Sequence, residues 1–262
     1  MLGTVGKASR LLDLFTGETP EWGVTDAALA LRVPTSSAHD LLDTLAHTGL
    51  LRRVQGNRYR LGLKLLTLSS TALDSFAVRG HARPVMERLA AKLGATVHLA
   101  TLDATEVVYV DKITPAAGPE IGLSGVGRRL PLHCTAVGKA LLAQQSAGAI
   151  GQTLDQLGME PFTDQTVCSV DALRFELVGS RRAGVARDRE GSVLGVCCHA
   201  APIIEAGRAT AAISVSVPVA MEQRLAERYD EIVRAAAVKI SRDLAAAAAA
   251  STHERPRRPV AV

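Results

Sequence analysis

Basic side chains are concentrated in one short stretch of the sequence, where they could bind an anionic partner. Between Thr44 and Leu73 the chain contains five basic residues and no acidic residue. They are Arg52, Arg53, Arg58, Arg60 and Lys64. A β-hairpin with this much positive charge attracts the phosphates of duplex DNA, although a hairpin whose arginines are merely solvated would have the same sequence. The elements around the cluster must decide between these two interpretations.

The segment before this cluster predicts a helix with a polar outer face. Ala38, Leu41, Leu42 and Leu45 have helical spacing and form its inner face. The outward residues are Thr35, Ser36, Ser37, His39, Asp40 and Asp43. Hydroxyls and amides at the start of such a helix bind phosphate oxygens, and side chains one turn further on reach base edges. Phosphate repels Asp40 unless it accepts from a cytosine amino group, or turns sideways to pair with an arginine.

The surrounding pattern predicts a winged helix-turn-helix over residues 1–62. Short helices over 5–15 and 26–31 precede the outward-facing helix, and two short strands around a turn at 55–57 follow it. Helices and a hairpin in this order form a DNA-binding motif, so we interpret the basic cluster as a DNA contact. The expected contacts are Thr35, Ser36, Ser37, His39, Asp40, Arg52, Arg53, Arg58 and Arg60.

A second group of polar residues lies far along the chain. Ser214 and Ser216 alternate with apolar residues, as on a strand with one small polar face, and the usual cause is a solvent-facing strand. Cys197 and Cys198 are neighbours on a strand and face opposite sides, and a buried cysteine is usually a packing residue. Asp188 precedes this strand, where it is either a turn residue or an acceptor for a ligand hydroxyl.

A helix is expected over residues 135–147. The amides of Ala136, Val137 and Gly138 at its start have no helical acceptor, and the helix dipole favours an anion there. The alternative is a helix that is simply packed into the core. Lys139 in its first turn is expected to be a surface lysine.

The same region allows catalytic and metal-binding interpretations. Cys198 or Asp188 working with His199 would make the chain an enzyme, but His199 points to the other face of the strand from Cys198. The spacing of Asp188, Glu190 and His199 matches no common metal-ligand motif. We therefore expect no catalytic residue, no metal site and no cofactor.

The remainder of the chain predicts a helical linker and an α+β domain. Residues 63–80 carry a narrow apolar stripe, typical of a linker helix that pairs with a second copy. Pro84 suits the first turn of the next helix. Strands are expected over 193–200 and 209–219, and a long alanine-rich helix over 222–250. The tail, residues 251–262, is polar and expected to be disordered.

Composition restricts the class of protein. The chain has 262 residues, of which 47% are hydrophobic and 21% charged, as in globular proteins. Its net charge of +4 is too small to establish a nucleic-acid partner without the clustering described above. Four cysteines without CxxC spacing argue against a disulfide scaffold and a cysteine zinc finger. No apolar run approaches the ~18 residues of a membrane span and no signal-peptide core is evident, so a reducing cytoplasm is the expected setting.

Four segments, in this order and spacing, resemble the IclR (isocitrate lyase regulator) family of bacterial transcriptional regulators over about residues 5–245. They are SSAHDLLDTLAHTGLLRR with NRYRLGLKLLTL, then GRRLPLHCTAVGKALLA, GVARDREGSVLGVCCHAAPI and AAISVSVP. The sequence departs from the family pattern at three positions. Asp40 stands where the family usually has Arg, Gly191 where a second Glu is usual, and Val217 where Gly is usual.

The resemblance implies a GAF-like effector-binding domain over residues 81–250, after the winged helix-turn-helix and the linker helix. It implies a homodimer or homotetramer that binds promoter DNA, with repression as the expected sign and a small organic acid or aromatic compound as effector. On the family's motifs the effector contacts are Ala136, Val137, Asp188, Cys198, Ser214 and Ser216. Together these groups suit a small carboxylate. The alternative function is an enzyme that converts a small molecule with Cys198 and Asp188.

Overall fold

Two compact units make up the computed structural model of the chain, Met1–Ser75 and Phe76–Val262. The structure describes residues 3–116 and 121–253. No helix within these ranges is both long enough and apolar enough to cross a membrane.

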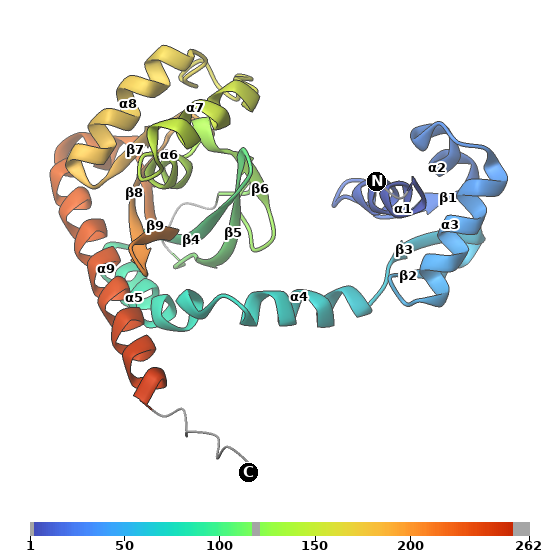
Figure 1. Ribbon diagram of the computed structural model, residues 1–262. Coiled ribbons are helices and arrows are strands. Elements are labelled where there is room, and N and C mark those ends of the chain that lie inside the picture. The colour runs from blue at the N-terminus through green and yellow to red at the C-terminus, as the bar shows by residue number, and fades with distance from the viewer. Residues whose placement is uncertain (1–2, 117–120, 254–262) are drawn as a thin grey trace, which may run out of the picture. The chain divides into compact units, whose positions relative to one another are not determined.

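The N-terminal unit is a winged helix-turn-helix, as the sequence predicts. Its elements are α1 (Gly3–Asp13), β1 (Trp22–Gly23), α2 (Val24–Leu31), α3 (Thr35–His47), β2 (Leu51–Val54), β3 (Arg58–Leu61) and α4 (Lys64–Asp74). The strands pair antiparallel in the order β1-β3-β2 (Figure 1). The turn of the hairpin is placed by Gly56, whose φ of 74° lies in the left-handed region. Leu11, Leu42 and Tyr59 are buried between the helices and this small sheet.

The helix after the wing differs from the predicted linker. α4 ends at residue 74, and α5 (Ala77–Leu93) starts a new helix, so the predicted linker over 63–80 divides between two helices. The prediction that Pro84 begins a helix is wrong, because Pro84 lies inside α5. Val78 and Ala82 are buried, and their packing draws the residues before the proline into the helix despite the bond that proline cannot donate.

No residue of α4 is buried within this chain. Leu63 just before it and Leu66 within it are 72% and 69% exposed. A helix of this length without packed side chains is marginal in water, so α4 depends on surroundings that cover these leucines.

The C-terminal unit is an α+β fold built on one antiparallel sheet. Its strands are β4 (Thr96–Asp103), β5 (Glu106–Ile113), β6 (Arg129–Pro131), β7 (Ala186–Arg189), β8 (Val196–Glu205) and β9 (Arg208–Pro218). The further helices are α6 (Ala136–Leu142), α7 (Ala147–Gln156), α8 (Val170–Ala183) and α9 (Val219–His253). The spatial order of the strands is β6-β5-β4-β9-β8-β7. α5 and α9 cover one face of the sheet and α6 covers the other, with α8 packed on α6 (Figure 1).

Three predicted boundaries in this unit need correction. The helix expected over 135–147 is the short α6, and α7 begins separately at residue 147. The strand expected over 193–200 runs from 196 to 205. Residues 251–253 of the expected disordered tail continue α9, whereas residues 254–262 lie outside the described part of the chain.

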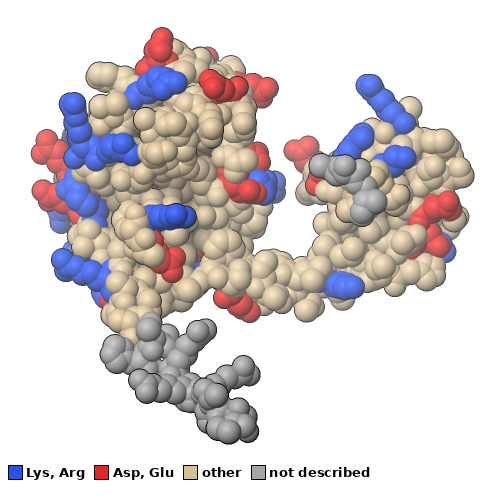
Figure 2. Space-filling model, in the orientation of Figure 1, with Lys and Arg blue, Asp and Glu red and all other residues tan. Residues whose placement is uncertain are grey.

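Charges of both signs are interspersed on the surface. Figure 2 shows Lys and Arg side chains beside Asp and Glu on the visible face of each unit, with no continuous basic field. Because the net charge of +4 is small, the contacts of individual arginines decide where positive charge is available.

Gly62 is required by a close approach between the residue that follows β3 and the turn that follows α3, the recognition helix of the helix-turn-helix. A Cβ at Gly62 would lie 2.1 Å from the carbonyl oxygen of Gly49. We expect Gly62→Ala to lower the stability of the N-terminal unit by about 1–3 kcal/mol, measured by urea unfolding followed by circular dichroism. Gly80→Ala is the control, because a Cβ there meets open space on a helix and should stabilise by up to ~1 kcal/mol. Equal midpoints for Gly62→Ala and the parent chain would contradict the constraint.

Candidate DNA-binding surface and ligand cavity

The outer face of α3 presents most of the predicted DNA contacts to solvent. Thr35, Ser36, His39 and Asp40 are exposed, and Ser37 is half-buried. The opposite face is fixed in the core, because its residues Ala38, Leu42 and Leu45 are buried. Hydroxyls therefore stand at the start of an exposed helix, where free amides also point outward.

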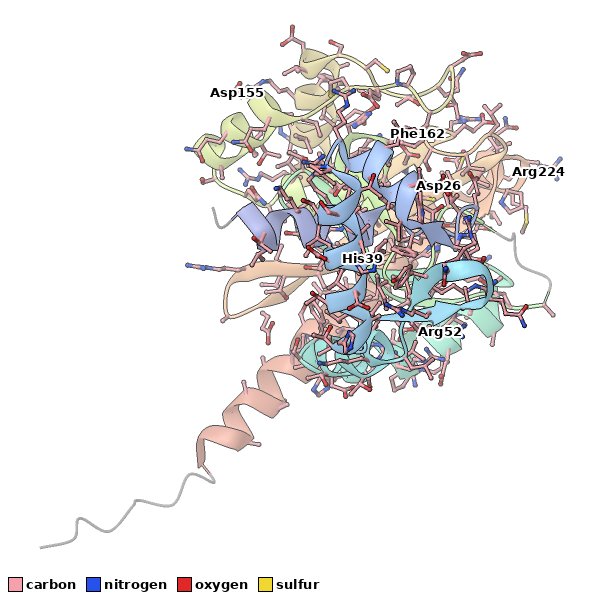
Figure 3. All side chains as sticks on the ribbon, turned by 90° about the vertical axis from the view of Figure 1, so that its right-hand side faces the viewer. Asp26, His39, Arg52, Asp155, Phe162 and Arg224 are labelled. Carbon is pink, nitrogen blue, oxygen red and sulfur yellow. The ribbon has the colours of Figure 1, made fainter. Side chains whose placement is uncertain are left out.

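The wing adds positive charge beside this helix. His39 on α3 and Arg52 on β2 both lie on the side of the N-terminal unit that is turned to the viewer in Figure 3. Arg52 is exposed and makes no ion pair with any described residue. Its charge is thus available to a phosphate group.

The other three wing arginines are held by acidic residues that come before the basic stretch. Arg60 Nε lies 2.6 Å from Glu21 Oε1, and Arg58 lies 3.4 Å from Oε2 of the same carboxylate. Arg53 pairs with Asp43 of α3. These acids precede the stretch from Thr44 to Leu73, so its composition gave no sign of them. They contact the arginines because the β-hairpin folds back onto α3 and onto the loop before β1.

Asp40 pairs with no arginine among the residues that the structure describes. Its carboxylate lies 3.4 Å from Nδ1 of the neighbouring His39, and its side chain is 80% exposed. Of the two alternatives for Asp40, the sideways pair with an arginine is not formed, because Asp43, one turn further along α3, pairs with Arg53 instead.

In the C-terminal unit, five of the six predicted effector contacts line one cavity. They are Ala136, Val137, Cys198, Ser214 and Ser216. The cavity lies between the start of α6 and the strands β8 and β9, and its volume of about 20 Å³ is room for roughly one water molecule. Ser214 and Ser216 are 3% and 0% exposed, so the solvent-facing alternative for this strand is wrong.

Asp188 does not line this cavity. It is 4% exposed, and its Oδ1 lies 2.9 Å from Lys139 Nζ while its Oδ2 accepts from the Gly191 amide at 3.2 Å. Asp188 therefore belongs to a buried ion pair that holds β7 to α6, and its direct contact with a ligand stays a prediction.

Lys139 is likewise buried, against the expectation of a surface lysine. Its Nζ contacts Glu176 Oε2 at 3.0 Å as well as Asp188. Burial lowers the pKa of Lys139, but the two carboxylates more than offset this and raise it overall, so the ammonium stays charged. The helical position of residue 139 gave no signal of this pairing, because the partners come from α8 and β7.

The start of α6 has one free amide fewer than expected. Thr135 is the N-cap, and its Oγ1 accepts from the Gly138 amide at 3.2 Å. Gly138 is needed here, since a Cβ would lie 2.5 Å from the carbonyl oxygen of Leu132.

Sequence reasoning missed His98 and Ser124, which also line the cavity. His98 lies opposite Ser214 in the pairing of β4 with β9. Its Nε2 is 2.7 Å from Ser124 Oγ, and its Nδ1 is 3.4 Å from Ser216 Oγ. Only the alternation of β4 hinted at an inward His98, and no sequence feature indicated that β4 and β9 are neighbours.

The titratable groups of the cavity are neutral. Burial, and then the charge of Lys112, lower the pKa of His98 to about 3. Burial raises the pKa of the Cys198 thiol to about 12. The thiol is therefore not an activated nucleophile.

The alternative function, an enzyme in which Cys198 works with His199, requires a catalytic pair that the structure separates. His199 is buried on the other face of β8, where its Nδ1 lies 2.7 Å from Asp230 Oδ1 of α9. Cys198 instead contacts Ser216 Oγ at 3.1 Å, so the two side chains diverge as their adjacency on a strand requires. Among the described residues, no group of three or more His, Cys, Asp or Glu could hold a metal ion.

A winged helix-turn-helix followed by a unit with a small polar cavity defines a DNA-binding transcriptional regulator with an effector-binding domain. Residues 4–55 match the family model of the IclR helix-turn-helix domain, and residues 70–242 match that of the bacterial transcriptional regulator IclR C-terminal domain. The chain belongs to the IclR family.

Curated relatives and solved structures agree with this membership. The HTH-type transcriptional regulator XynR of Escherichia coli is 34% identical over 218 residues, which are 82% of this chain and 86% of XynR. The glycerol operon regulatory protein of Streptomyces coelicolor is 33% identical over 245 residues, 92% of this chain and 95% of that protein. An IclR homolog from Microbacterium hydrocarbonoxydans, complexed with 4-hydroxybenzoate, has a TM-score of 0.81 and 28% identity, covering 93% of this chain and 100% of that chain.

The Lys139–Asp188 pair yields a stability prediction. Lys139→Met leaves the Asp188 carboxylate buried without its cation, so we expect a loss of about 3–5 kcal/mol in urea unfolding of the full chain. The double variant Lys139→Met with Asp188→Leu removes both charges and should recover part of this loss. Lys239→Met is the matched control, because its pair with Asp243 is exposed and should change stability by less than ~1 kcal/mol. Equal effects of Lys139→Met and Lys239→Met would contradict a buried ion pair.

Proposed function

We propose that this protein is a cytoplasmic repressor that binds promoter DNA as a homodimer or homotetramer, and that a small carboxylic acid changes its affinity for DNA. The observation that carries the proposal is the cavity of the C-terminal unit, where hydroxyl and thiol groups line one small space. Such a cavity, in a chain whose other unit exposes a helix-turn-helix face, suits a sensor of a metabolite. The proposal needs no cofactor.

The DNA contacts proposed are the nine residues of the helix and the wing. Arg52 would bind phosphate directly because its charge is uncompensated. Arg53, Arg58 and Arg60 would bind by exchanging an acidic partner for a phosphate oxygen, since all three pairs are at the surface. His39 and Asp40, one turn into α3, would face base edges.

The effector contacts proposed are the five cavity residues and Asp188, whose buried ion pair with Lys139 lies outside the cavity lining. The relative complexed with 4-hydroxybenzoate supports a carboxylate as the class of ligand. A compound of that size exceeds a volume of about 20 Å³, so the cavity would enlarge on binding.

The proposed regulation is a population shift between states with different affinity for DNA. An effector changes that balance only by binding one state more tightly, and couplings of this kind amount to about 1–3 kcal/mol. The exposed leucines of α4 support pairing with a second copy of the chain, which would set the distance between two recognition helices.

The DNA-binding proposal predicts a selective effect of Arg52. Arg52→Ala should weaken binding to the protein's own promoter and to unrelated DNA by the same factor. It should also reduce the slope of the logarithm of the DNA-binding constant against the logarithm of the salt concentration by about 1, because one phosphate contact is lost. Fluorescence anisotropy at several salt concentrations measures both. Arg224→Ala, which removes an exposed arginine of the C-terminal unit (Figure 3), should leave both unchanged. A folded chain that binds no promoter DNA even at low salt would refute the proposed function.

The effector proposal predicts that Ser214 contributes to binding but little to stability. Its hydroxyl makes no hydrogen bond with any described residue, so Ser214→Ala should change the unfolding midpoint only slightly. An acid that raises the thermal midpoint of the parent chain by mass action should bind the variant several-fold more weakly, as expected for one lost hydrogen bond of about 1 kcal/mol. Ser70→Ala on exposed α4 is the control. If none of a set of aliphatic and aromatic carboxylic acids raises the thermal unfolding midpoint of the parent chain, the proposal that the effector is a carboxylic acid is wrong.

A further inference from the structure

The cavity that holds the predicted effector contacts has no charged lining. Neither Lys, Arg, Asp nor Glu is among the described residues around it. Behind α6, Lys139 is paired with Asp188 at 2.9 Å and with Glu176 at 3.0 Å, so its charge is already matched by carboxylates. A carboxylate that enters therefore finds hydroxyl and thiol donors but no lining cation.

The hydrogen bonds around His98 have one consistent direction. Ser124 Oγ donates to the Ile121 carbonyl oxygen at 3.1 Å, so it accepts from His98 Nε2 at 2.7 Å. The proton of the neutral imidazole is then on Nε2, and Nδ1 is a bare acceptor that faces Ser216 Oγ at 3.4 Å. The contact between Ser216 Oγ and Cys198 Sγ, at 3.1 Å, completes this series of hydrogen bonds.

An anion at this position needs a compensating positive charge. Burying an unpaired carboxylate costs several kcal/mol even when neutral groups donate to it. Of the groups that line the cavity, His98 is the one that can become a cation, because Tyr109 and Cys198 can only lose a proton. Its acceptor nitrogen faces the serines that would bind the carboxylate.

We propose that a carboxylate ligand enters this cavity together with one proton, which is held between the carboxylate and Nδ1 of His98. The inference rests on the proposed function, in which this cavity is the effector site. It makes His98 a specificity-determining residue and favours monocarboxylates, because a second negative charge would remain unpaired.

The groups that face His98 come from several elements. β5 provides Tyr109, whose ring centroid is 5.2 Å away, and Lys112, which lies opposite His98 in the strand register. The ammonium of Lys112 donates to the carbonyl oxygens of Ile121 and Ser124 at 2.8 and 2.6 Å. Among the described residues, the remaining neighbours are uncharged and come from the 121–124 turn, β8 and β9: Ser124, Cys198, Ser214 and Ser216.

These neighbours fix the sign of the pH dependence. Without a ligand anion, His98 is neutral, since burial and the charge of Lys112 lower its pKa. A bound carboxylate raises that pKa, so the complex holds a proton that the free protein lacks. Affinity should therefore rise as pH falls, by about tenfold for each pH unit, as long as the free ligand is ionised.

Isothermal titration calorimetry of the full chain tests the proposal. The probes are 4-hydroxybenzoate and glycolate, which are carboxylate anions between about pH 6 and pH 8, and uncharged 4-hydroxybenzamide serves as a control. When binding is measured in two buffers of different ionisation enthalpy, the binding of each acid should be accompanied by the uptake of about one proton, and the binding of the amide by none. His98→Gln keeps a donor for Ser124 but cannot become a cation, so its residual binding should be independent of pH.

The alternative outcomes are distinguishable. Binding of the acids without proton uptake, weakened by Lys112→Gln, would assign the compensating charge to Lys112 and overturn the proposal while the effector site stands. If neither acid binds the parent chain at any pH, the carboxylate effector of the proposed function fails and the proton coupling fails with it. The buffer comparison on the parent chain decides the matter even if His98→Gln does not fold.

Discussion

The position of β9 between β4 and β8 is the constraint on which the ligand-binding unit depends. Antiparallel pairing sets His98 opposite Ser214 and Cys198 opposite Ser216, although these strands are more than a hundred residues apart at their extremes. The side-chain alternation of a strand then sends Cys198 towards the cavity and His199 towards α9. The strand register thus places the polar cavity on one face of the sheet, and the ionic contact between His199 and Asp230, which holds α9, on the other face.

Charge is arranged differently in the two units. In the N-terminal unit, arginines at the surface are paired with carboxylates that water can readily replace. In the C-terminal unit, the ammonium of Lys139 is inaccessible and is matched by Asp188 and Glu176, while the adjoining cavity has only neutral polar groups. The first arrangement suits exchange with a polyanion, and the second keeps a fixed electrostatic background around a small ligand.

Helical and strand periodicity were sufficient to predict the winged helix-turn-helix, because its elements are contiguous and each buries one face. The same logic failed at Pro84, where burial of Val78 and Ala82 outweighs the local preference of proline. It also failed at Lys139 and Asp188, whose environment depends on partners from distant elements. Family motifs selected Cys198, Ser214 and Ser216 for the cavity, yet His98 was missed because its role follows from strand order, which no local pattern contains.

The small volume of the cavity would have a kinetic consequence for the proposed effector. A space of about 20 Å³ has to widen before any compound larger than water can pass its wall. Entry of the proposed effector would then wait for an opening fluctuation of the protein, and its association rate would level off at high ligand concentration instead of following the collision frequency. Dissociation would wait for the same fluctuation, so the effector would stay bound while its concentration falls briefly. The response of the regulator would therefore average the metabolite concentration over time.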